Sequence, residues 1–328
     1  MHDPNANLAM IDATVTRALG LWDLQKAAAT RINVSENVTY LVETARGRSV
    51  LRVHRPGYHS RRAIECELAW IDALRASGTV RTAGLRKGIN GQVLQQADFP
   101  DGTARFLVMF DHIPGQPPAE DGDLAPGFRE LGAIAAGSHL HSLAWMRPEP
   151  FERLTWDADA VFGETPHWGD WRDAPNVTPE IRKVLEQVET VVRRRLAAFG
   201  KASDRYGLIH ADMRLANLIQ TPGGTALIDF DDSGFGWFLY DFAAAISFIE
   251  DNPQVPELKT AWLDGYRSVR DLPESDAMEL DTFVMLRRMA LLAWIGSHIN
   301  APEPQALAPD FARVSADLGA VYLARFAR

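Results

Sequence analysis

Residues 210–232 read HADMRLANLIQTPGGTALIDFDD, and this stretch determines how the rest of the chain is interpreted. Short apolar runs lie on either side of its TPGG turn, which predicts a β-hairpin. Asp212 and Asn217 stand at the two ends of a polar loop that enters the first strand, and Asp229 stands at the exit of the second. If the strands pair, two carboxylates and one amide converge at the same edge of the hairpin.

Carboxylate and amide oxygens in such an arrangement favour a magnesium site. Mg²⁺ is usually held by one or two carboxylates, and the phosphate oxygens of a bound substrate complete its shell. The remaining carboxylate can accept a proton from an attacking hydroxyl group. Single Asp and Asn residues are also common in turns, where they bond to the backbone. The complete spacing between two apolar strands favours the metal-dependent site.

Composition limits the class of protein. The chain has 328 residues, 46% of them hydrophobic, and a net charge of −9, which predicts a folded protein with one large core or two lobes. An acidic chain has no general electrostatic reason to bind nucleic acid. The sequence has one cysteine, Cys66, no secretory segment and no apolar run of bilayer length. We therefore expect a cytoplasmic protein without a membrane partner.

The chain changes character near residue 112, where β-rich sequence gives way to helical periodicity. The expected strands before this point are 37–43, 49–54, 92–96 and 105–111, with a helix at 60–76. The expected helices after it are 128–145, 178–199, 237–250, 256–269 and 277–299, interrupted by a strand at 207–209 and the hairpin. This order predicts an α+β fold with a small β-rich N-terminal lobe and a larger helical C-terminal lobe. Residues 147–176 give no clear element.

His210, Asp212, Asn217 and Asp229 together resemble the catalytic and metal-binding loops of the aminoglycoside phosphotransferase and choline kinase superfamily, which includes homoserine kinase and stress-response kinase relatives. The resemblance implies a bilobal protein-kinase-like fold that transfers the γ-phosphate of ATP, with Mg²⁺, to a hydroxyl. It implies a nucleotide-binding lobe at 1–112 and a helical lobe with the acceptor site at 113–328.

The resemblance also implies roles for individual residues of the C-terminal lobe. Asp212 is the base or the group that orients the acceptor hydroxyl, while Asn217 and Asp229 bind the metal ion. Asp241 is a structural support for the catalytic loop. Arg214 stands two residues after Asp212, where protein kinases place a lysine against the transferring phosphate, and it is otherwise a surface arginine. His210 is expected to be a scaffold residue.

The N-terminal lobe carries weaker motifs of the same resemblance. The expected nucleotide-binding residues are Ser35, Asn37, Arg52, Glu67, Met109, Phe110 and His112. Arg52 occupies the position of the usual phosphate-binding lysine, and arginine also binds phosphate oxygens in pairs. Glu67 is the expected acidic partner of Arg52, with Glu65 as the alternative. Phe110 and His112 are expected to meet the adenine through their backbones.

The identity of the acceptor is open at this point. An amino alcohol, a homoserine-like amino acid and an aminoglycoside-like molecule are the candidates, bound by a monomer or a homodimer. The alternatives are a stress-response type Ser/Thr protein kinase and a nucleotide-binding pseudokinase, the latter because of Arg52.

The sequence also offers candidate residues for the acceptor site. Glu250 or Asp251 is a candidate for binding an amine of the acceptor. One of Asp231 and Asp232 contacts a second metal ion or a cationic substrate, or the two form a solvated acidic turn. Trp168, Trp171 and Trp294 are candidates for lining the acceptor cleft.

Overall fold

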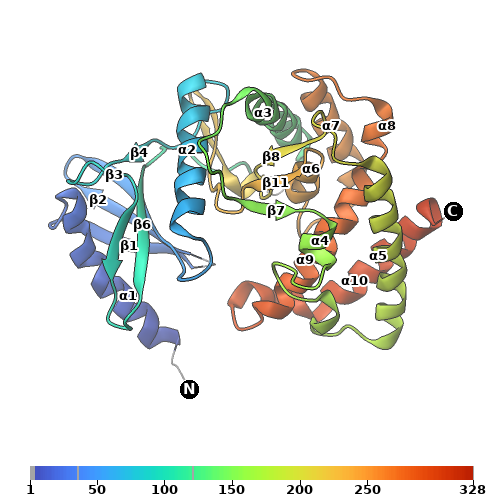
Figure 1. Cartoon of the computed structure of the whole chain (residues 1–328), viewed down its shortest axis with the longest axis horizontal. Coiled ribbons are helices and arrows are strands. Elements are labelled where there is room, and N and C mark those ends of the chain that lie inside the picture. Colours follow the sequence, from blue (N-terminus) through green and yellow to red (C-terminus); the bar gives the residue numbers. More distant parts are fainter. Residues whose placement is uncertain (1–3, 35–36, 120–121, 328) are drawn as a thin grey trace. The chain divides into compact units, whose positions relative to one another are not determined.

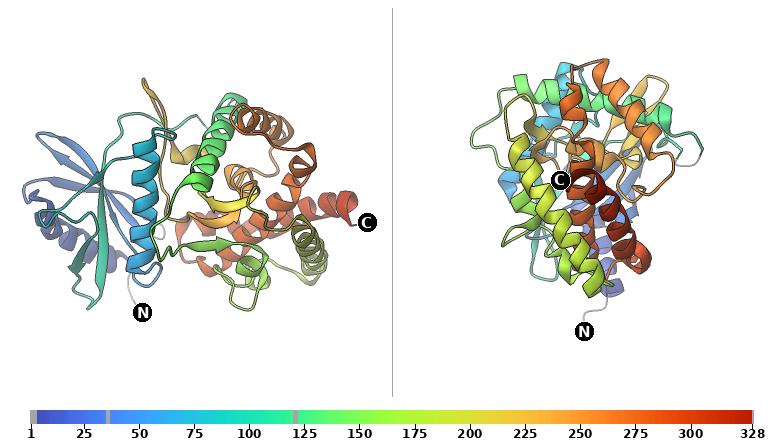
Figure 2. Two further views of the ribbon diagram at one scale, coloured as in Figure 1. Left: turned by 45° about the horizontal axis from the view of Figure 1, so that its top comes forward. Right: turned by 90° about the vertical axis from the view of Figure 1, so that its right-hand side faces the viewer.

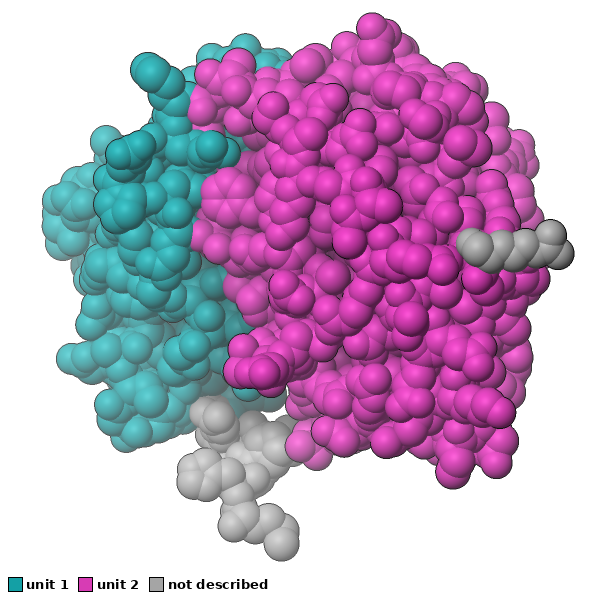
Figure 3. All heavy atoms as spheres, turned by 45° about the vertical axis from the view of Figure 1, so that its right-hand side comes forward, with its two compact units in different colours: residues 1–115, 146–152, 221–231 teal, residues 116–145, 153–220, 232–328 magenta. Residues whose placement is uncertain are grey.

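The computed structural model describes residues 4–34, 37–119 and 122–327. The chain forms two compact units (Figure 3). Unit 1 comprises residues 1–115, 146–152 and 221–231, and unit 2 comprises residues 116–145, 153–220 and 232–328. The α+β class predicted from the sequence is confirmed, because unit 1 is built around a β-sheet and unit 2 is mostly helical (Figure 1).

Unit 1 contains a six-stranded antiparallel sheet with the order β1-β2-β3-β6-β4, in which β5 also pairs with β6. Its strands are β1 (Ala28–Val34), β2 (Val38–Thr44), β3 (Gly47–Val53), β4 (Leu85–Arg86), β5 (Gln95–Asp98) and β6 (Ala104–Asp111). Its helices are α1 (Pro4–Ala18), the 3-10 turn η1 (Leu19–Trp22) and α2 (Arg61–Ser77). The strands predicted at 37–43, 49–54 and 105–111 and the helix predicted at 60–76 are present, and the strand predicted at 92–96 lies at β5 instead. The elements α1, β1 and β4 were not predicted.

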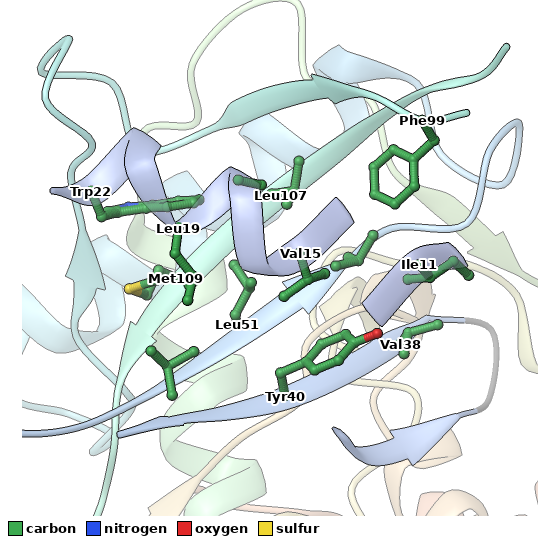
Figure 4. Close-up of a cluster of buried hydrophobic side chains, with 13 residues drawn as sticks. Ile11, Val15, Leu19, Trp22, Val38, Tyr40, Leu51, Phe99, Leu107 and Met109 are labelled. Carbon is green, nitrogen blue, oxygen red and sulfur yellow. The ribbon is translucent and has the colours of Figure 1, made fainter. Parts of the chain in front are cut away.

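The core of unit 1 lies between α1 and one face of its sheet (Figure 4). Ile11, Val15 and Leu19 recur every four residues and are buried, so they form one face of the α1–η1 segment. On β2, every second side chain is buried, which is the pattern of a strand with one covered face. The helical face and the strand face together form one apolar cluster that includes Tyr40 and Met109.

Unit 2 is a set of helices with a small three-stranded sheet (Figure 2). The helices are α3 (Ala125–Ala144), α4 (Ala158–Phe162), α5 (Pro179–Phe199), α6 (Tyr240–Ala245), α7 (Val255–Arg267), α8 (Glu274–Ala277), α9 (Leu280–Ser297) and α10 (Pro302–Phe326), with the 3-10 turns η2 (Trp171–Asp173) and η3 (Leu215–Asn217). The strands β7 (Leu154–Trp156), β11 (Gly234–Trp237) and β8 (Tyr206–Ile209) form the sheet in that order. Across the described ranges, no helix combines the length and the apolar character that crossing a bilayer requires.

Most of the predicted helices are present, with one correction. Thr178 caps α5 as its sequence suggests, since its hydroxyl accepts a hydrogen bond from the Ile181 amide. The predicted helix at 237–250 is wrong at its start. Trp237 ends strand β11, which is buried between β7 and β8, and α6 is only six residues long. An apolar run that is buried on all sides carries no periodicity that separates a strand from a helix.

The hairpin around the TPGG turn is also present. β9 (Leu218–Thr221) and β10 (Gly224–Leu227) pair as a two-stranded sheet, and the boundary between unit 2 and unit 1 falls after Gln220. Asp229 therefore belongs to unit 1, while Asp212 and Asn217 belong to unit 2.

Two glycines set the close packing of α3 against α7. A Cβ atom at Gly132 would overlap the Trp262 carbonyl oxygen, and one at Gly265 would overlap the Arg129 carbonyl oxygen. Both obstacles are backbone atoms of the facing helix, which cannot rotate away. We expect Gly132→Ala to lower the free energy of unfolding by about 1–3 kcal/mol, because overpacking forces the helices apart.

Thermal or urea unfolding measures this effect, and Gly127→Ala is the matched control on the same helix. A Cβ there meets only the end of the Leu215 side chain, at 3.2 Å, which can shift. Equal stabilities of the two variants would contradict the packing argument.

Candidate active site

The loop of residues 210–217, here called the catalytic loop, connects β8 to β9 in unit 2 and carries Asp212 and Asn217. The side-chain amide of Asn217 donates to the Asp212 carboxylate oxygen Oδ2 at 2.8 Å and to the Asp212 carbonyl oxygen at 2.8 Å. Both bonds use the amide nitrogen, which orients the side chain and reserves its oxygen for another partner. The two residues predicted to work together are thus in direct contact.

Two arginines meet the other oxygen of the Asp212 carboxylate. Arg287 on α9 donates to Oδ1 at 3.1 Å, and the Arg214 Nε lies 3.2 Å from the same oxygen. Burial alone would raise the pKa of Asp212, but the positive charges of Arg214 and Arg287 outweigh it and hold the pKa below its ordinary value. Asp212 is therefore ionised at neutral pH. Arg214 was a candidate from the sequence.

Arg287 is a site residue that the sequence interpretation missed. It lies 75 positions after Asp212, in a helix whose other residues are mostly apolar and buried. No motif joins the two positions along the chain. The one available signal was a charged pair, Arg287-Arg288, inside an apolar helix, since unpaired charges are rarely buried.

Asp241, at the start of α6, supports the catalytic loop as expected. Its carboxylate accepts the Ala211 amide at 2.7 Å and the His210 amide at 3.3 Å. Ala211 has a φ of 65°, a left-handed conformation that is unfavourable for a side-chain-bearing residue. These bonds stabilise a strained backbone immediately before Asp212, which sets the direction of the Asp212 side chain.

His139 on α3 in turn holds the Asp241 carboxylate. Its Nε2 lies 2.9 Å from Asp241 Oδ2, and its Nδ1 lies 3.0 Å from the Tyr266 hydroxyl. Burial lowers the pKa of His139 in spite of the neighbouring carboxylate, so the ring is neutral. A neutral ring that donates to Asp241 accepts from Tyr266, and every polar atom of the ring is used.

Unit 1 holds a second cluster, centred on Arg52 of β3. Arg52 is buried and forms an ion pair with Glu67 of α2, as expected, whereas Glu65 pairs with surface arginines. The guanidinium also lies 3.4 Å from Asp229 Oδ1 and stacks on the Phe110 ring at 5.2 Å. The cluster therefore fixes Arg52, which stands at the position of the usual phosphate-binding lysine in the resembling family.

Asp231 belongs to the same cluster, and the interpretation of residues 231–232 as a solvated turn is wrong for it. Its side chain is buried, accepts the Asn37 amide at 2.8 Å and lies 3.6 Å from Arg52. Burial would raise the pKa of Asp231, but Arg52 and the neighbouring His59 outweigh it and lower the pKa. The residue is an internal counter-ion of unit 1. The predicted contact of Asn37 with the nucleotide stays a prediction.

The structure gives less information about the other residues that were predicted to bind the nucleotide. Ser35 lies outside the described residues. Met109 is fully buried in the core cluster of unit 1, while Phe110 and His112 are half-buried at the end of β6 and just after it. Their contacts with a nucleotide stay predictions.

Glu250 was a candidate for binding an acceptor amine, and the structure does not support this. Its carboxylate is buried and accepts the Arg288 guanidinium at 2.6 Å. Trp171 is buried as well and donates from its ring nitrogen to Glu189. Both residues stabilise the helices of unit 2. Trp168, in contrast, lies beside Arg287, with the guanidinium 5.2 Å from its ring centre.

A sheet-rich unit with a buried Arg–Glu pair, together with a helical unit that carries an Asp–Asn loop, defines a kinase-like phosphotransferase. The comparison with known proteins gives the particular family. The model of the phosphotransferase enzyme family matches residues 29–274, and the chain belongs to this family. It is a kinase, an ATP-dependent phosphotransferase that acts on a small molecule. The predicted cofactors, ATP and Mg²⁺, agree with this membership.

Similar proteins support the assignment. The structure of a microcompartment-associated aminopropanol kinase is 41% identical, with a TM-score of 0.89, and the match covers 95% of this chain and 97% of that one. The amicoumacin kinase of Bacillus subtilis (strain 168) is 26% identical over 236 residues, which are 69% of this chain and 67% of that protein. A structure of amicoumacin kinase hAmiN with AMP-PNP, Ca²⁺ and Ami shares the fold, with a TM-score of 0.76, 21% identity and a match that covers 96% of this chain and 94% of that one.

The support of the catalytic loop by Asp241 can be tested by mutation. We expect Asp241→Ala to lower the free energy of unfolding by about 3 kcal/mol, because buried N–H groups of the loop and of His139 lose their acceptor. We also expect it to abolish activity, since Asp212 loses its orientation. Chemical unfolding and an assay of the folded fraction measure the two effects separately.

The matched control is Asp264→Ala in the same unit. Asp264 is half-exposed, and its surface ion pair with Arg129 has a length of 3.0 Å. Such a pair contributes less than about 1 kcal/mol, so this variant should keep both stability and activity. An Asp241→Ala enzyme that is as active as this control would contradict the proposed support.

Proposed function

We propose that the chain transfers the γ-phosphoryl group of ATP to the hydroxyl group of a small amino alcohol. The observation that carries the proposal is the 41% identity to an aminopropanol kinase over 95% of the chain. The catalytic loop supports it, because an ionised carboxylate is held beside an amide that can bind a metal ion.

Charge also favours this acceptor over a homoserine-like amino acid. An amino alcohol is a cation at neutral pH, and the chain has a net charge of −9, which attracts cations weakly over a distance. A homoserine-like amino acid adds a carboxylate that the same field repels. A cytoplasmic location and a monomeric or homodimeric state stay predictions from the sequence.

The side chains present fit Mg²⁺ together with nucleotide phosphates. In the described part of the chain, no three His, Cys, Asp or Glu side chains form a group that could hold a metal alone. Mg²⁺ seldom needs such a group, because it keeps phosphate oxygens and water as ligands. We assign the Asn217 amide oxygen and the Asp229 carboxylate as the protein ligands. When bound, the ion offsets the negative charge of the phosphates.

Asp229 has two properties of a ligand residue. Its side chain is about half exposed, at 49%, although it neighbours the buried Arg52. Its φ is 61°, a left-handed conformation that a non-glycine residue adopts only under constraint. Strained backbone of this kind is concentrated at functional sites, where the surrounding structure holds it.

Asp212 orients the acceptor in the proposed mechanism. Its carboxylate accepts a hydrogen bond from the acceptor hydroxyl and directs the oxygen lone pair toward the γ-phosphorus for in-line attack. The low pKa of Asp212 makes it a weak base, which suits a loose transition state in which the hydroxyl proton leaves late. Arg52 takes the role of the usual lysine and binds nucleotide phosphates, and Arg214 offsets the charge of the transferred group.

A panel of acceptors tests the proposed substrate class. With ATP and Mg²⁺, we expect turnover of 1-amino-2-propanol and ethanolamine, measured as ADP release and as formation of the phosphate ester. Propylamine has no hydroxyl and 1,2-propanediol has no amine, so they serve as matched controls. Equal ADP release with propylamine would show ATP hydrolysis without transfer, and efficient turnover of 1,2-propanediol would contradict recognition of the amine.

The metal assignment has its own test. We expect Asp229→Asn to reduce kcat by about 100- to 1,000-fold, because electrostatic stabilisation of the transferring phosphoryl group depends on the ion. The apparent affinity for Mg²⁺, measured from the dependence of the rate on free Mg²⁺, should fall as well. Asp204→Asn, at a mostly exposed carboxylate, is the control. Normal kcat in Asp229→Asn would show that Asp229 is not a ligand.

A further inference from the structure

Helix α9 buries two consecutive arginines, Arg287 and Arg288, each 2% exposed. Their neighbours in the helix are mostly apolar and buried. A buried charge is costly unless it is paired, and replacing a buried ion pair by apolar side chains is often neutral or stabilising. The fold alone therefore gives no reason for two charges at this place, and each arginine needs its own explanation.

Arg288 is explained by structure. Its guanidinium donates to Glu250 at 2.6 Å and to the Ser315 hydroxyl at 2.8 Å, and it lies over the Phe311 ring. These partners come from α10 and from the segment after α6. Arg288 therefore joins elements of unit 2, and its hydrogen-bond partners among the described residues lie outside the catalytic loop.

Arg287 has a different set of partners. Its Nη2 donates to Asp212 Oδ1 at 3.1 Å, and its Nε donates to the Ser247 hydroxyl at 3.2 Å. The Trp168 and Tyr240 rings lie 5.2 and 5.8 Å from the guanidinium carbon. The buried Tyr240 side chain also interacts with the guanidinium. Arg287 therefore contacts the catalytic loop directly, whereas Arg288 bonds to Glu250 and Ser315.

We infer that Arg287 is the positioning residue that fixes the Asp212 carboxylate for transfer. This inference rests on the proposed role of Asp212. Arg287 holds Oδ1 from α9 and Asn217 holds Oδ2 from the catalytic loop, so both oxygens are bound from different elements. Two such bonds fix the plane of the carboxylate. The acceptor hydroxyl then meets an oxygen whose lone-pair direction is already set.

Arg214 contacts the same carboxylate oxygen but is less buried than Arg287. Its side chain is 30% exposed, against 3% for Arg287. The Arg287 guanidinium is held in place by Ser247 and by aromatic rings. A planar guanidinium with a fixed orientation transmits that orientation to the carboxylate.

The experiment compares Arg287→Ala with Arg288→Ala in the ATP, Mg²⁺ and 1-amino-2-propanol assay. We expect Arg287→Ala to lower kcat by about 100-fold, the effect of a small misplacement of a reacting group, with little change in the KM for ATP. Guanidinium chloride at millimolar concentration should restore part of kcat, whereas sodium chloride should not. Arg288→Ala should lose thermal stability but keep kcat per folded molecule, without a response to guanidinium.

The outcomes separate this inference from the proposed function. A normal kcat in Arg287→Ala, or a loss that guanidinium does not restore, overturns the inference if Asp212→Asn is inactive. A normal kcat in Asp212→Asn overturns the proposed role of Asp212, on which this inference rests, whereas no turnover of 1-amino-2-propanol by the unmodified enzyme overturns the proposed function. If Arg287→Ala does not fold, Arg287→Lys replaces it. Lysine lacks the planar pair of donors, so we expect a lowered kcat, and a normal kcat again overturns the inference.

Discussion

The carboxylate of Asp241 holds the catalytic loop through the backbone amides of His210 and Ala211. A residue other than glycine adopts a left-handed backbone conformation only when surrounding bonds stabilise it. Ala211 does so directly before Asp212, and the neutral His139 behind Asp241 keeps the carboxylate in place. The direction of the Asp212 side chain thus depends on a buried bond network that contains no group of the reaction itself.

Charged and polar side chains also surround Asp212 and Asp229, the two carboxylates predicted to act at the site. Asp212 has arginines on one oxygen and an amide on the other, so it stays ionised in spite of its burial. In unit 1, Arg52 shares its charge with Glu67 and with two aspartates that follow β10. Each cluster brings together residues from distant parts of the chain. A charge in the interior is tolerated because an opposite charge lies within hydrogen-bond distance of it.

The separate elements could be predicted where the sequence has a clear period or a turn signal. Strands β2, β3 and β6 of unit 1, the helix that contains Glu67 and the hairpin were predicted in this way. The predicted helix at 237–250 wrongly included Trp237, the last residue of strand β11, because this strand is buried between two others and lacks alternation. The helix α1 was not predicted, although it covers the apolar face of the sheet in unit 1. Its role becomes visible only once that face is known.

The sequence by itself determined the type of chemistry: an Asp, an Asn and a second Asp at fixed spacings around a hairpin, and an Arg where the family has a Lys. Short-range spacing specifies these features because the loop and the strands are local. Only the tertiary structure decided which side chains surround them. Arg287 contacts Asp212, although 75 positions separate them in the sequence. Asp231 is a buried counter-ion of Arg52, and Glu250 forms an ion pair with Arg288. Such pairings depend on how the helices pack, and no local pattern encodes which of several charged residues will meet.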